Sequence, residues 1–286
     1  MAQIFFVSGA QKSGTTWLQR LLDAHPEVVC SGEGHFVEEL VGPLLKLREA
    51  YNAKQALVGE RVYEGEPYYP PMSRGEIGKV ARELILGRMS SRQPGAQAVG
   101  DKTPRYTQHQ HILAELFPEA RFLNMVRHPY DVAVSRLHHG LRAGVEQALQ
   151  AGHPAHQTLV RNAAEAWIGA QAKVAAFRAK TKPERFLQLR YEDLLAAPEA
   201  EAARAFRFLG VSDAGGTVAA AVAASAFEAL SGRPPGEEDP RSFFRKGVAG
   251  DWRGKLDAAD LQTIDALCGD QMRAEGYQSA ADEVGG

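Results

Sequence analysis

The chain has 286 residues, with 33 Lys and Arg against 35 Asp and Glu, so its formal net charge at pH 7 is −2. Hydrophobic residues make up 44% and charged residues 24%, which is typical of globular proteins and excludes a disordered chain, a coiled coil or a collagen-like fibre. The near-neutral charge argues against a nucleic-acid-binding protein, but it is compatible with a local basic pocket for a small anion.

The cysteine spacing does not indicate a zinc module or a disulfide framework. The hydropathy pattern does not indicate a membrane span. Cys30 and Cys268 lie far apart, and no apolar run approaches the roughly 18 residues that cross a membrane. The histidines at 138, 139, 153 and 156 lack a metal-site arrangement and are expected at the surface. A cytoplasmic protein with two reduced thiols is therefore expected.

Apolar runs that alternate with helical patterns predict one α/β domain with a parallel sheet. Buried strands are expected at 4–7, 122–126 and 185–190, with shorter candidates at 28–30 and 98–99. Helices are expected over 15–25, 36–48, 73–90, 109–117, 130–139, 159–180, 213–236 and 256–273. Residues 51–72 and 236–251 are expected to be irregular, and 140–157 a loop or short helix.

The first strand leads into the strongest chemical signal, the segment GAQKSGTTW at 9–17. A glycine-containing loop between a strand and a helix presents backbone N–H groups to an anion, and Lys12 adds a positive charge. In the P-loop of nucleoside triphosphatases, Lys directly follows the second Gly. Here Thr15 follows Gly14 instead. A phosphate cradle is favoured over an ordinary capped turn, but it is not a standard P-loop.

Two later segments carry cations beside a hydroxyl or a glycine. Arg127 follows the strand at 122–126, and Ser135 lies two helical turns further on, so both could bind one phosphate. Alone, this pattern fits a surface ion pair equally well. Arg245 and Lys246 precede Gly247 in a loop that could fold over an anion, although alone this pattern is more typical of a solvated basic turn.

Together, in this order, the three segments resemble the sulfotransferases that use 3′-phosphoadenosine-5′-phosphosulfate (PAPS). That family has a 5′-phosphosulfate loop of the form PKSGTTW, a 3′-phosphate motif with Arg and Ser eight residues apart, and a late RKGxxGDW segment. The chain matches them at 10–17, at Arg127 and Ser135, and at 245–252, and it lacks only the leading Pro of the first. The Tyr of the family's YEDL segment matches Tyr191.

The resemblance implies a three-layer, P-loop-like α/β fold with a central parallel sheet flanked by helices. It implies in-line transfer of a sulfuryl group from PAPS to an acceptor hydroxyl or amine, leaving adenosine 3′,5′-bisphosphate (PAP). Lys12 would stabilise the charge on the leaving phosphate, so no metal is expected. The implied nucleotide-binding residues are Lys12, Ser13, Gly14, Thr15, Thr16, Trp17, Arg127, Ser135, Tyr191, Arg245, Lys246 and Gly247.

The general base is where the sequence departs from the cytosolic sulfotransferases. Those carry a His in a KTHLP-like segment, but Pro104 stands at the matching place here. The segment LLDAHPEVVCSGEGHF instead resembles the tyrosylprotein and heparan sulfate sulfotransferases, whose base matches Glu33. His35 is the competing candidate, because an unperturbed imidazole titrates near neutral pH. Lys102 is expected to contact the transferring sulfonate, as in the tyrosylprotein branch.

Two other functions fit parts of the pattern. The first, the main alternative, is a P-loop phosphotransferase or kinase with a degenerate loop. Such an enzyme needs a metal-binding carboxylate, and Asp101 matches that requirement only weakly. The other is a nucleotide-binding module that has lost catalysis.

The acceptor is expected to be a small molecule, a saccharide or a peptide, and not a nucleic acid. Its pocket is assigned to insertions around 36–72, 140–160 and 228–244 of a single domain over 1–286. The oligomeric state is not predictable from these patterns.

Overall fold

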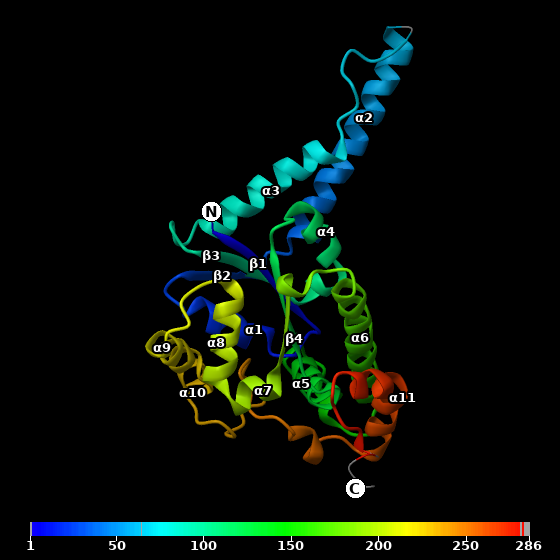
Figure 1. The fold of residues 1–286 in the computed structure, drawn as a ribbon. Helices are drawn as coiled ribbons and strands as arrows, with labels where there is room; N and C mark the ends of the chain where they lie inside the picture. Colours follow the sequence, from blue (N-terminus) through cyan, green and yellow to red (C-terminus); the bar gives the residue numbers. More distant parts are fainter. Residues whose placement is uncertain (1, 64, 281, 283–286) are drawn as a thin grey trace.

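The computed structural model describes residues 2–63, 65–280 and 282 and centres on a parallel sheet in the order β2-β3-β1-β4-β5 (Figure 1). In register, Phe5 of β1 lies beside Gly100 of β3 and Arg121 of β4. All neighbouring strands run parallel, so their carboxyl ends meet at one edge, where ligands bind in such sheets. The expected strands are confirmed as β1 (Gln3–Gly9), β2 (Val28–Gly32), β3 (Ala98–Lys102), β4 (Arg121–Val126) and β5 (Phe186–Arg190).

Helices follow or separate these strands along the chain. They are α1 (Thr15–Asp23), α2 (Gly42–Val62), α3 (Arg74–Ser90), α4 (Gln110–Leu116), α5 (Pro129–Arg142), α6 (Pro154–Arg178), α7 (Tyr191–Ala196), α8 (Pro198–Leu209), α9 (Gly215–Ser225), α10 (Phe227–Ser231) and α11 (Ala258–Ala274). Shorter 3₁₀ or π segments lie at Val37–Val41, Pro104–Gln108, Glu146–Leu149, Pro183–Arg185 and Asp251–Gly254.

Helices cover both faces of the sheet because successive strand residues point to opposite sides. In β1, Phe5 and Val7 pack in a cluster that includes α1, α8 and α9, whereas Ile4 and Phe6 pack in a cluster with α3, α4 and α6. Figure 1 shows α1, α8 and α9 on one side of the sheet and α4 and α6 on the other. The expected three-layer α/β architecture is thus confirmed.

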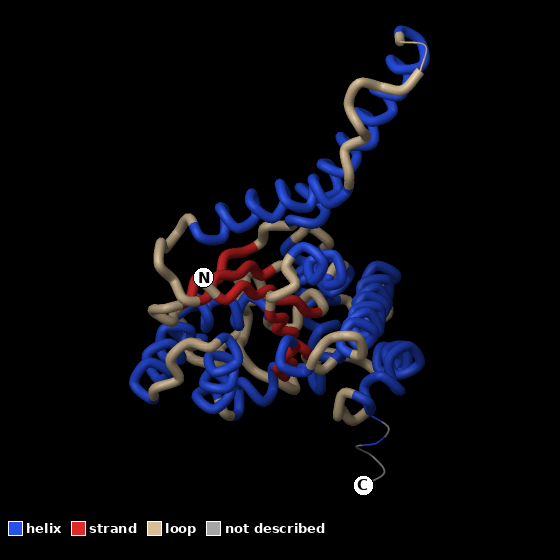
Figure 2. Tube along the Cα trace, turned by 45° about the horizontal axis from the view of Figure 1, so that its top comes forward, coloured by secondary structure: helices blue, strands red, loops and turns tan. Residues whose placement is uncertain are grey.

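Helix α2 is longer than the sequence predicts. A helix was expected to end near 48 and an irregular segment to follow over 51–72, but α2 continues to Val62. Residues 49–58 contain no Gly or Pro and include several good helix formers, so nothing in them interrupts the helix. Figures 1 and 2 show α2 extending away from the rest of the molecule.

Two of the histidines expected at the surface are buried. They are His138 in helix α5 and His156 in helix α6. Both ring nitrogens of His156 have a partner. Its Nδ1 lies 2.8 Å from the carbonyl oxygen of Ala148, and its Nε2 lies 2.9 Å from a carboxylate oxygen of Asp260. Asp260 is 104 residues away in the chain, so local sequence gave no sign of this pairing. In the part of the chain that the structure describes, no helix is long and apolar enough to cross a membrane.

Candidate active site

A cavity of about 530 Å³, here called the central pocket, lies at the carboxyl ends of the strands. It is lined by residues that follow each strand of the described sheet. The predicted site residues in its lining are Lys12, Gly14, Thr15, Thr16, Trp17, Glu33, Arg127, Ser135, Tyr191, Arg245, Lys246 and Gly247. Ser13, His35 and Lys102 lie outside the lining.

The loop after β1 is curled by two residues in the left-handed region. Lys12 has φ 74° and Gly14 has φ 90°. A Cβ atom at Gly14 would lie 2.5 Å from the Tyr191 ring, so this position requires glycine. Ser13 is fully buried, and its hydroxyl makes no hydrogen bond to any residue that the structure describes. Helix α1 then begins at Thr15, which brings the N–H groups of its first turn to the pocket wall.

Lys12 lies among other cations. Burial, and after it the charges of Arg142 and Arg136, lower the pKa of Lys12 to about 8, while the Glu33 carboxylate acts in the opposite direction. Its Nζ lies 5.9 Å from the centroid of the Phe243 ring. An anion bound beside Lys12 would relieve this charge repulsion.

Arg127 is fixed in the wall of the central pocket. Its guanidinium carbon lies 4.1 Å from the centroid of the Tyr191 ring, and its Nη2 donates a 3.0 Å hydrogen bond to the carbonyl of Val248. The backbone carbonyl of Arg127 accepts a 2.9 Å hydrogen bond from the Trp167 indole. Its buried Nε donates to no described residue, which leaves a donor free for a ligand.

Asp131 is a site residue that sequence reasoning missed. Its buried carboxylate accepts the N–H of Gly250 at 2.8 Å and the N–H of Trp252 at 3.2 Å. The same carboxylate lies 3.7 Å from Nη2 of Arg127. Asp131 therefore joins the late basic segment to Arg127. From sequence alone, an Asp in the first turn of a helix indicates only helix stabilisation.

The basic turn at 245–247 is partly buried and ion-paired, unlike the solvated turn that its sequence alone favours. Arg245 pairs with Glu238 at 2.6 Å and Asp251 at 2.5 Å, and Lys246 pairs with Asp251 at 2.6 Å. Gly247 has φ 67°, and a Cβ atom there would lie 2.4 Å from the Phe227 ring. These contacts hold the turn against the central pocket.

Glu33 lies at the edge of the central pocket, after β2. Its Oε1 is 2.6 Å from Nζ of Lys102, and its Oε2 is 3.3 Å from Nε2 of His35. The Lys102 side chain is only 4% exposed and also donates to the Thr16 hydroxyl at 3.2 Å. Of the two candidate bases, Glu33 lines the central pocket, whereas His35 lies outside its lining and contacts Glu33.

The comparisons with known proteins show the family of the chain. A family model described as the sulfotransferase family matches residues 4–214. The chain belongs to this family. A relative that matches most of the chain is nodulation protein NoeE of Sinorhizobium fredii, which is 27% identical over 97% of this chain and 66% of its own length.

Two other sulfotransferases match a shorter part. Omega-hydroxy-beta-dihydromenaquinone-9 sulfotransferase Stf3 of Mycobacterium tuberculosis is 31% identical over 39% of this chain and 28% of its own length. Protein-tyrosine sulfotransferase 2 of Gallus gallus is 28% identical over 43% of this chain and 31% of its own length. The chain thus spans about a third or less of these two relatives.

Solved sulfotransferases share the fold. The sulfotransferase domain of the Synechococcus PCC 7002 olefin synthase has a TM-score of 0.53 and 21% identity, and the match covers 94% of each chain. Mouse sulfotransferase SULT7A1, complexed with PAP, has a TM-score of 0.53 and 16% identity over 95% of this chain and 85% of its own. These likenesses confirm the P-loop-like architecture expected for a sulfotransferase.

Asp101, the weak match for a kinase-type metal ligand, has another role in this family member. Its carboxylate accepts hydrogen bonds from the Tyr106 hydroxyl at 2.7 Å, the Thr103 hydroxyl at 2.9 Å and the N–H of Gly34 at 3.1 Å. Burial raises its pKa, and it lies outside the central pocket. It thus shapes the turn that carries Glu33. Over residues 2–63, 65–280 and 282, no group of three or more His, Cys, Asp or Glu is arranged to hold a metal ion.

The expected insertions contribute unequally to the central pocket of this sulfotransferase. Segment 228–244 supplies Phe243 and Phe244 among others, and 140–160 supplies Arg142. Segment 36–72 supplies no described residue to it, because α2 projects away from the strand ends (Figure 1). Residues at its start line a neighbouring cavity of about 420 Å³ that shares Glu33. The assignment of these segments to the acceptor stays a prediction.

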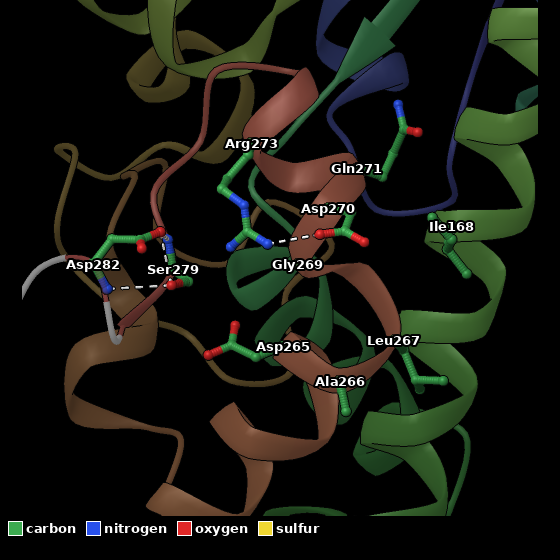
Figure 3. A pocket seen from close by; sticks show the side chains of 10 residues that line it. All are labelled: Ile168, Asp265, Ala266, Leu267, Gly269, Asp270, Gln271, Arg273, Ser279 and Asp282. Carbon is green, nitrogen blue, oxygen red and sulfur yellow. Dashed lines mark hydrogen bonds and ion pairs between the residues drawn. The ribbon is translucent and has the colours of Figure 1, made fainter.

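A separate cavity of about 460 Å³ lies between α6, α11 and the segment that follows α11 (Figure 3). Its polar groups pair with one another or with neighbours: Arg273 contacts Asp270 at 2.7 Å, and Ser279 donates to Asp282 at 2.8 Å. None of the site residues predicted from the sequence lines it. The central pocket is therefore the candidate active site.

Proposed function

We propose that the chain transfers a sulfuryl group from PAPS to an acceptor hydroxyl or amine and releases PAP. The observation that carries this proposal is the meeting of three distant segments, around Lys12, Arg127 and Arg245, in one pocket of a sulfotransferase-family fold. The segment around Lys12 follows β1, whereas Arg127 follows β4 and is joined to the segment around Arg245 through Asp131. This separation suits a nucleotide with phosphates at both the 5′ and 3′ positions.

The nucleotide would be held as follows. The N–H groups of the loop at 12–16 and the hydroxyls of Thr15 and Thr16 would bind the 5′-phosphosulfate. Arg127, Ser135 and the basic turn at 245–247 would bind the 3′-phosphate. The rings of Trp17, Tyr191 and Phe227 line the same pocket and would contact the adenine.

The reaction would be an in-line displacement at sulfur. The acceptor oxygen attacks the sulfur while Glu33 accepts its proton, and the bond between sulfur and the bridging phosphate oxygen breaks. The electron pair of that bond stays on the phosphate of PAP, where Lys12 stabilises the new charge. Lys102 orients the Glu33 carboxylate and is proposed to contact the transferring sulfonate. Because Lys12 supplies the charge, no metal is proposed.

The acceptor is proposed to be a small molecule, a saccharide or a peptide. Two relatives support a small molecule and a peptide, since their names specify a hydroxylated menaquinone and protein tyrosine as acceptors. The expected cytoplasmic location stays a prediction.

Calorimetric titration tests the choice of donor. We expect PAP to bind with 1:1 stoichiometry in the presence of EDTA and at least about tenfold more tightly than ATP, because two phosphate sites are engaged instead of one. Arg127→Ala should weaken PAP binding and leave the binding of AMP, which lacks a 3′-phosphate, nearly unchanged. Tighter binding of ATP in a magnesium-dependent manner would favour the kinase interpretation instead.

Asp131→Asn is expected to weaken PAP binding at least about tenfold. Hydrogen bonds to a charged group contribute about 1.5–3 kcal/mol each, and the amide would replace a carboxylate that holds both Arg127 and the late basic segment. At saturating PAPS, kcat should change little, since Asp131 acts through its neighbours. Asp270→Asn, at an exposed position on α11, is the control. An unchanged dissociation constant for PAP would contradict the linking role.

A further inference from the structure

The loop that carries Glu33 has little support of its own. It follows β2, which lies at the edge of the sheet, and residues 33–35 belong to no helix or strand. His35 has φ 45°, a left-handed conformation that a residue other than glycine keeps only where its surroundings hold it. The Glu33 side chain is itself 38% exposed. Contacts from elsewhere in the fold must therefore fix this loop if its carboxylate is to keep one position.

These contacts come from the segment at the end of β3. The backbone N–H groups of residues 34–36 donate in turn to the Asp101 carboxylate at 3.1 Å, the Thr103 hydroxyl at 3.4 Å and the Tyr106 hydroxyl at 3.4 Å. Both hydroxyls then donate to the same carboxylate, Tyr106 at 2.7 Å and Thr103 at 2.9 Å. All three side chains are buried. The hydrogen bonds of three consecutive loop residues thus lead to one buried carboxylate.

The direction of these hydrogen bonds is set by chemistry. Burial raises the pKa of the Tyr106 phenol, so its hydroxyl keeps its proton and donates it to Asp101. Burial also raises the pKa of the Asp101 carboxyl, while the hydrogen bonds that it accepts act in the opposite direction. A buried network in which one member loses its partner is costly, so this network favours a single arrangement of the loop.

Lys102 holds the same base from the other side. It lies between Asp101 and Thr103, and successive residues of an extended chain point to opposite sides. Its Nζ lies 2.6 Å from Oε1 of Glu33 and donates to the Thr16 hydroxyl at 3.2 Å. The end of β3 therefore contacts both the backbone that follows Glu33 and the Glu33 carboxylate.

We infer that Asp101, Thr103 and Tyr106 are positioning residues that hold Glu33 where it accepts the proton of the acceptor. This role rests on the proposed function, because it concerns the proposed base. None of the three lines the central pocket, so they act through the loop and not on the nucleotide. A general base works only within hydrogen-bond reach of the proton, and a displacement of about 1 Å can lower a rate about 10²-fold.

Tyr106→Phe tests the role because it removes one hydroxyl from the network and keeps the ring in the core. The assay is ³⁵S transfer from PAPS to the phenol, saccharide or tyrosine-containing peptide that the unmodified protein uses fastest. We expect kcat to fall about 10–100-fold and the dissociation constant for PAP to stay within about twofold. Tyr277→Phe is the matched control, since that buried hydroxyl donates to Glu192 at 2.8 Å, away from Glu33, and its loss should leave kcat unchanged.

Asp101→Asn is the second variant. Its amide nitrogen cannot accept the hydrogen bonds that the carboxylate oxygen accepts, so kcat should fall at least as far as in Tyr106→Phe, again with PAP binding retained. If both variants keep kcat within about twofold of the unmodified protein, the positioning role is wrong. The same conclusion follows if PAP affinity falls by the same factor as kcat.

A double-mutant cycle separates positioning from a general effect on the fold. In the Glu33→Gln background, Tyr106→Phe should lower kcat by no more than about twofold, because no base remains to be positioned. An equal loss in both backgrounds would overturn the inference. Absence of transfer by the unmodified protein, or full kcat in Glu33→Gln alone, would instead reject the proposed function or its base, so the failures are distinguishable.

Discussion

Replacing Lys12 by Ala is expected to lower turnover by about 10²–10³-fold while PAP binding is largely retained. A cation placed where charge develops contributes mainly to the transition state, and removing one such group typically costs this much. Lys12 is suited to this role because its loop is curled into the left-handed region and its ammonium group is partly buried next to other cations. The remaining contacts to PAP, from the loop N–H groups and Arg127, are untouched by the change.

The measurement is a comparison of kcat, with PAPS saturating, and of the dissociation constant for PAP. Lys54→Ala is the matched control, because Lys54 is an exposed lysine on the projecting helix α2. Turnover of Lys12→Ala close to that of the unmodified protein would remove Lys12 from the mechanism. A parallel collapse of PAP binding would show that Lys12 serves binding and not catalysis.

Replacing Glu33 by Gln is expected to lower kcat by about 10²–10⁴-fold with unchanged nucleotide affinity. The amide keeps the size of the carboxylate and can still accept a hydrogen bond from Lys102, but it cannot take the acceptor's proton. His35→Ala should have a smaller effect, because His35 lies outside the pocket lining and reaches the site only through its contact with Glu33.

The Glu33 variant needs a stability control, because Lys102 is nearly buried and Glu33 is its carboxylate partner. Breaking such a pair can destabilise the fold. Thermal unfolding should therefore be measured for Glu33→Gln and for the double variant Glu33→Gln/Lys102→Met, which removes the unpaired charge. If the folded variants retain full kcat and His35→Ala does not, His35 is the base.

Much of the fold was predictable because its signals are local. Most of the buried strands contain a short apolar run, and residues that follow each strand line the pocket. The loop at 9–17 is contiguous, so its glycine, lysine and threonines indicate an anion site without knowledge of the rest of the fold. The parallel order of the strands then brings Arg127 and Tyr191 to the same edge.

What the sequence did not predict depends on contacts between distant residues. The carboxylate of Asp131 bonds to backbone N–H groups about 120 residues later, and no local pattern announces such a link. The need for glycine at 247 comes from the Phe227 ring, which only the folded loop brings close.

The length of α2 was missed for a different reason. The tyrosines and prolines within 51–72 suggested an irregular segment, but the prolines of that stretch come after Val62 and do not interrupt the helix. The helix-forming residues at 49–58 allow the helix to continue. As a result, this helix extends away from the strand ends that the central pocket adjoins (Figure 1).

The most direct test of the central claim is transfer of ³⁵S from labelled PAPS to an acceptor by the purified protein in the presence of EDTA. A panel of phenols, saccharides and tyrosine-containing peptides would serve as acceptors. We expect a labelled product to form together with an equal amount of PAP, and both to form about 10²–10³-fold more slowly with Lys12→Ala. Absence of transfer to every acceptor, combined with magnesium-dependent transfer of phosphate from ATP to one of them, would contradict the account.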